Sequence, residues 1–130
     1  MNGGIRKYAT IHSTNVVNFD RPYEGPQRAY IAIRRSKAGQ DVMFGIQRGQ
    51  FMCHVFECTI TVRSDDAPPV RMTASAPADQ STTLVFISNE RNFIHKLSTA
   101  KQVRVAAEIY HQGAPVFEFT TAGFDATSVK

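Results

Sequence analysis

Long apolar stretches are absent from this chain of 130 residues. No run approaches the roughly 18 residues that a membrane-spanning helix needs, so the sequence predicts no transmembrane segment. The start of the chain, MNGGIRKYATIHS, also lacks the apolar core of a signal peptide. We therefore expect either a cytoplasmic protein or the mature form of an exported one.

Tryptophan is absent too, and the cysteines number only two. The remaining composition, 42% hydrophobic and 20% charged, is ordinary for a folded protein and excludes bulk disorder. A chain of this length can bury the core of one domain. We predict a disordered N-terminus over 1–7, a single β-rich domain over 8–125 and a C-terminal tail over 126–130.

Alternation of apolar and polar side chains is the main structural pattern, and it is typical of half-buried strands. In DVMFGIQRG the side chains of Val42, Phe44 and Ile46 share one face, and CTITVR repeats the pattern. Gly45 predicts a bulge or a close approach to a neighbouring strand. The stretch 37–40 is predicted as a hairpin turn, and 20–27, with two prolines and a glycine, as a loop.

The period changes once, in SNERNFIHKLSTAK. Phe93, Ile94 and Leu97 lie at helical spacing, and Ser88 or Asn89 can cap the first turn. We predict one short α-helix near residues 89–100 that plugs an end or covers an edge of the sheet. With about eight mostly antiparallel strands, the fold class is mainly β, a β-sandwich or a small barrel.

Cys53 and Cys58 flank four residues between two alternating segments, and we expect them at facing positions on a β-hairpin. That placement suits a disulfide, which indicates an oxidising compartment. The alternative is a pair of reduced, buried thiols in a cytoplasmic protein. A metal site with His54 is a third interpretation, but adjacent strand residues point to opposite faces, so we predict no metal and no cofactor.

Catalytic motifs are also lacking. Asp79 and Ser81 lie close together with His95 downstream, but no G-x-S-x-G elbow surrounds the serine. A turn in which these side chains bond nearby backbone amides is the simpler interpretation. We predict that the protein is not an enzyme, with a small hydrolase as a minor alternative.

The net charge is +4, and several cations lie near one predicted hairpin. Arg34, Arg35, Lys37 and Arg48 form the predicted binding face, although such arginines are often only a solvated surface. An alternative function is a cytoplasmic nucleic-acid-binding barrel that stacks bases on rings. The candidate rings are Tyr30, Phe51 and Phe56.

Several stretches resemble a group of small, uncharacterised proteobacterial envelope proteins. They are DVMFGIQRGQFMC, CTITVRSDD, PADQSTTLVFI, AKQVRV and VFEFTTAGFD. More remotely, the order of elements resembles the VasI/TagO-type accessory proteins of type VI secretion. The resemblance implies an exported β-rich domain, periplasmic or secreted, with no catalytic residues to transfer. It favours a non-enzymatic binding or assembly module whose partner is a protein or an envelope component.

Overall fold

The computed structural model describes residues 7–36, 39–53, 57–79 and 81–122. Eight of the described strands form one antiparallel sheet in the order β1-β4-β5-β8-β7-β6-β9-β10, and β2 pairs with β3 separately. The elements are β1 (Lys7–His12), β2 (Val17–Phe19), β3 (Gly25–Gln27), β4 (Ala29–Ser36), β5 (Gly39–Ile46), β6 (Glu57–Ser64), β7 (Val70–Ser75), β8 (Leu84–Ile87), α1 (Glu90–Thr99), β9 (Gln102–Ala107) and β10 (Val116–Thr120). The predicted mainly β class with one short helix is confirmed.

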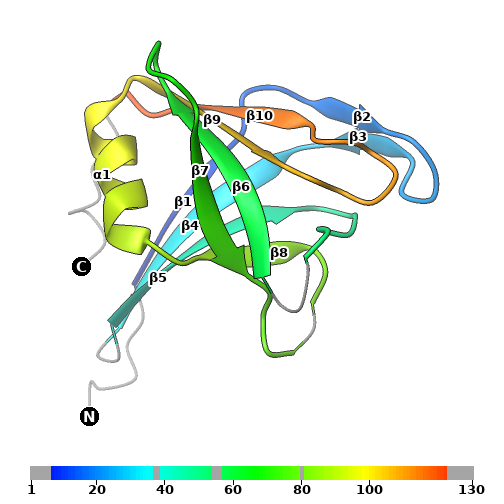
Figure 1. Cartoon of the computed structure of the whole chain (residues 1–130), viewed down its shortest axis with the longest axis horizontal. Coiled ribbons are helices and arrows are strands. Elements are labelled where there is room, and N and C mark those ends of the chain that lie inside the picture. The colour runs from blue at the N-terminus through cyan, green and yellow to red at the C-terminus, as the bar shows by residue number, and fades with distance from the viewer. Residues whose placement is uncertain (1–6, 37–38, 54–56, 80, 123–130) are drawn as a thin grey trace.

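The large sheet curls until its two ends approach each other. In Figure 1, β6 and β7 cross the front while β1, β4 and β5 pass behind, and β9 and β10 run along the top. The segment that follows β1 reaches β10, where the Thr14 amide donates to the Glu118 carbonyl at 2.7 Å. The sheet is therefore nearly a closed barrel.

A side chain completes this closure. The Oδ1 atom of Asn15 accepts a hydrogen bond from the Glu118 amide at 2.7 Å, and its Nδ2 donates to the Val116 carbonyl at 2.9 Å. The Asn15 amide therefore occupies the place that a backbone amide would take in a continuous ladder.

The core fills the interior of the barrel from the predicted inward positions. Val42, Phe44 and Ile46 are buried, as is the matching set of β6. Phe44 is central, because its ring lies 5.6 Å from that of Phe51 and 6.3 Å from those of Phe117 and Phe119. The period-two pattern therefore identified the inward face correctly.

Helix α1 covers one end of the barrel. The Asn89 side chain caps it by accepting from the Asn92 amide, and Phe93 and Leu97 are buried beneath it. The helix contacts both β5 and β9, which are not neighbours in the sheet, so it bridges the opening between them. The predicted helix and its cap are confirmed. Among the described residues, no helix has the length and apolar character to cross a membrane.

Two local predictions are wrong. β5 pairs with β4 and β8, whereas β6 pairs with β7 and β9, so no hairpin joins β5 to β6. Alternation identifies a strand but not its partner. The predicted loop 20–27 contains β3, where Pro26 is tolerated because β3 has only one strand neighbour. The β4–β5 hairpin is confirmed by the Ser36–Gly39 pair, but residues 37 and 38 lie outside the described residues.

Candidate functional site

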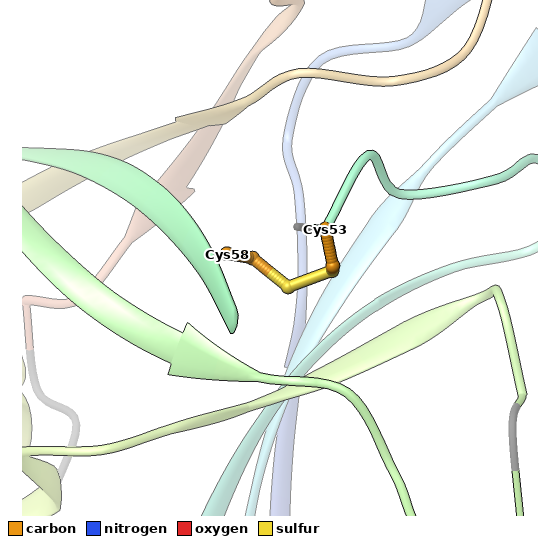
Figure 2. Close-up of a disulfide and its surroundings, with 2 residues drawn as sticks. All are labelled: Cys53 and Cys58. Atoms are coloured by element: carbon orange, nitrogen blue, oxygen red, sulfur yellow. A yellow bond between two sulfur atoms is a disulfide. The ribbon is translucent and has the colours of Figure 1, made fainter. Parts of the chain in front are cut away.

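The two cysteines form a disulfide, although not across a hairpin. Cys53 lies in the segment that leaves β5, and Cys58 lies near the start of β6, with their Cα atoms 4.3 Å apart (Figure 2). Just before Cys53, Phe51 forms a bridge with Ile109. The disulfide therefore ties this crossing segment to β6. No free cysteine occurs in the described part of the chain.

The predicted basic face is divided by the structure. Arg34 forms an ion pair with Asp41, which lies opposite it on β5, while Arg35 donates to the side chain of Gln40 at 3.0 Å. These two arginines are successive strand residues and therefore point to opposite faces of the sheet.

Arg48 does not restore this face. Arg48 follows the far end of β5, a strand of 8 residues, which separates it from the β4–β5 turn by about 25 Å. Lys37 lies outside the described residues. The three described arginines of the predicted face therefore do not form one patch.

The two described stacking rings do not form a platform either. Phe51 is only 6% exposed and packs against Phe44 in the core. Tyr30 is half-buried above Gly45, where burial raises the pKa of its hydroxyl. Phe56 lies outside the described residues.

The simpler interpretation of Asp79 and Ser81 is confirmed. The Ser81 amide donates to Asp79 Oδ1 at 2.9 Å, so the pair stabilises a turn. His95 lies on the exposed side of α1, and the described residues place no hydrogen bond between it and Ser81. His54 is outside the described residues, within which no three His, Cys, Asp or Glu side chains cluster as metal ligands.

A groove that the sequence did not reveal lies on the outer face of β6, β9 and β10. Its floor is a row of small side chains that the register places side by side, Thr61 opposite Ala106 and Ala106 opposite Val116. The next row contains long side chains, with Arg63 opposite Arg104. Small residues beside long ones leave a trough of about 200 Å³, to which Pro69 also contributes.

The groove combines an apolar lining with two cations. Val116, on the last strand of the sheet, is 45% exposed and gives the groove an accessible apolar side chain. Arg104 pairs with Glu118 at 3.2 Å, whereas the Nε of Arg63 donates to the Ala67 carbonyl at 3.1 Å. The groove can accept an apolar group of a ligand, and its arginines can pair with an anion beside that group. The described residues that line it include no nucleophile–base pair.

The sequence contained only a weak signal for this groove. Thr61, Ala106 and Val116 are outward positions of predicted strands, but they are far apart in the chain. Their juxtaposition depends on β6 pairing with β9, which alternation alone does not specify. The chain matches no protein-family model, no curated protein and no solved structure at significant similarity.

Proposed function

We propose that this chain is an exported, non-enzymatic binding module that acts in an oxidising compartment such as the bacterial periplasm. The observation that carries the proposal is the Cys53–Cys58 disulfide. Structural disulfides persist in secreted and periplasmic proteins and are rare where cytosolic reductants keep thiols free. The sequence resemblance to envelope proteins supports the same compartment.

The binding role is supported by the surface chemistry. The outer groove exposes an apolar strand residue beside Arg63 and Arg104, a combination suited to recognition. The nucleic-acid-binding alternative gains no support from the predicted basic face, because its arginines lie on opposite faces and at opposite ends of the β4–β5 hairpin.

The thiol state in the native cell tests the proposal. Cells are quenched with acid, and the purified protein is alkylated either before or after reduction. Its intact mass is then compared with that of the Cys53→Ser, Cys58→Ser double variant treated in the same way. We expect alkylation only after reduction, together with recovery in the extracytoplasmic fraction. Alkylation without reduction in a cytoplasmic fraction would refute export, and salt-sensitive oligonucleotide binding would then be the next measurement.

A further inference from the structure

The shape and charge of the outer groove indicate which class of ligand it binds. Its floor is formed by Thr61, Ala106 and Val116, three side chains that come from three adjacent strands. The floor is rigid, because the residues that alternate with it, including Val62 and Val105, are fully buried in the core. A partner therefore meets a preformed surface and does not have to order it.

The size of the groove limits what can enter it. Its volume is about 200 Å³, below the range of about 300–1,000 Å³ typical of pockets that enclose a small molecule. It is also an open trough on a sheet face. These dimensions suit one apolar side chain presented by a larger partner.

The charge around the groove favours particular residues beside that apolar side chain in the partner. Arg63 and Arg104 lie directly opposite each other, and within the described residues Glu118 is the only acid that forms an ion pair with either. Arg71 adds a third cation, because it lies opposite Thr61 on β7. Arg63 uses its Nε on a backbone carbonyl, so its terminal N–H groups remain donors suited to a carboxylate.

The lining favours protein over nucleic acid. Single-stranded nucleic acids bind to basic grooves in which aromatic side chains stack with the bases. The described residues that line this groove are Thr61, Arg63, Pro69, Arg104, Ala106 and Val116, and none of these carries an aromatic ring. An apolar side chain flanked by Asp or Glu fits both the floor and the arginines.

We propose that the groove on β6, β9 and β10 binds an acidic protein segment, which inserts one apolar side chain over Ala106 and pairs its carboxylates with Arg63. This inference rests on the proposed binding function and names its surface and ligand class. The overall charge of +4 adds an attraction for such a segment.

Peptide selection tests the proposal without presupposing a sequence. A random-heptapeptide phage library is panned on the purified, oxidised protein, with the Arg63→Glu, Ala106→Phe double variant as the counter-target. We expect enriched peptides that combine a large apolar residue with Asp or Glu. Enrichment of basic peptides, or no enrichment over the counter-target, would overturn the proposal.

Single variants then locate the site. We expect the enriched peptides to bind Arg63→Glu and Ala106→Phe about tenfold or more weakly than the unaltered protein. Arg91→Glu is the matched control, because it makes the same charge change at an exposed position on α1 and should leave affinity unchanged. Circular dichroism establishes that each variant is folded. Equal affinity of the peptides for all variants would overturn the assignment. It would also be overturned if a labelled oligothymidine bound the unaltered protein more tightly than the peptides do and Arg63→Glu abolished that oligothymidine binding.

The tests of the groove and of the proposed export can fail independently of each other. Native disulfide and extracytoplasmic recovery, combined with failed peptide selection, would retain the exported module and remove this groove as its binding surface. Reduced cysteines combined with successful selection would retain the groove and refute export.

Discussion

Tyr30 on β4 lies directly opposite Gly45 on β5, and its ring fills the space above the glycine. A Cβ atom at position 45 would collide with ring atoms and the hydroxyl oxygen of Tyr30. Glycine is required here because of this close approach.

We expect Gly45→Ala to lower the free energy of unfolding by about 1–3 kcal/mol, since the ring must move from its packed position. In a Tyr30→Ala background the same substitution should be neutral or stabilising, because alanine suits a strand better than glycine does. Urea denaturation of the four proteins in this cycle measures the coupling. An equal cost in both backgrounds would show that the ring is not the cause.

The ionisation of Tyr30 gives a pH dependence. Burial raises the pKa of its hydroxyl, so the folded protein favours the neutral phenol more strongly than the unfolded chain does. Its contribution to stability is fully present below the unfolded pKa of about 10 and is lost as pH rises through the higher folded pKa. We expect stability to fall less steeply above pH about 10 in Tyr30→Phe than in the unaltered protein. Parallel slopes in denaturation curves across this range would contradict the assignment.

Removal of the disulfide should weaken the protein without unfolding it. The bond closes a loop with a sequence separation of only 5, for which the chain-entropy relation gives about 2 kcal/mol. The Cys53→Ser, Cys58→Ser variant should therefore lose about that much free energy of unfolding. Dithiothreitol is the control, because it should bring the unaltered protein to the variant's stability and leave the variant unchanged. A variant as stable as the oxidised protein would rule out a stabilising role.

The hydrogen bonds of Asn15 give a prediction for stability. Asn15→Ala removes the partners of the Glu118 amide and the Val116 carbonyl, so it should cost about 1–3 kcal/mol in unfolding free energy. Asn15→Asp keeps an acceptor for the amide but sets a carboxylate oxygen against the Val116 carbonyl, so we expect it to lower the free energy of unfolding as well. Asn18→Ala, at an exposed position on β2, is the matched control for thermal denaturation. Equal melting temperatures for all three variants would contradict the closure role.

Much of the fold follows from local patterns. The inward set of β6 and the position of α1 were predictable, because both depend on the spacing of apolar residues within one short segment. The pairing of β6 with β9 was not predictable. It joins residues that are far apart in the chain, such as Ile60 and Ala107, so no pattern within one short segment specifies it.

In the candidate site, too, local features were predictable and features that depend on strand pairing were not. The disulfide partners were predictable from the cysteine count, but their placement on a hairpin was wrong because β5 and β6 lie apart in the sheet. The groove requires Thr61 and Ala106 to be neighbours, so it exists only once the register is known. Arg34 and Arg35 of the predicted basic face point to opposite sides of the sheet, since adjacent residues cannot share a face of a strand.

Asn15 has a further consequence beyond stability. An open strand edge presents unpaired amides and carbonyls that can recruit a strand from another molecule and begin aggregation. On β10, the Glu118 amide and the Val116 carbonyl are already bonded to the Asn15 side chain. The Thr14 amide also bonds to the Glu118 carbonyl, so two successive residues after β1 occupy this part of the edge and leave fewer groups of β10 open to intermolecular strand addition.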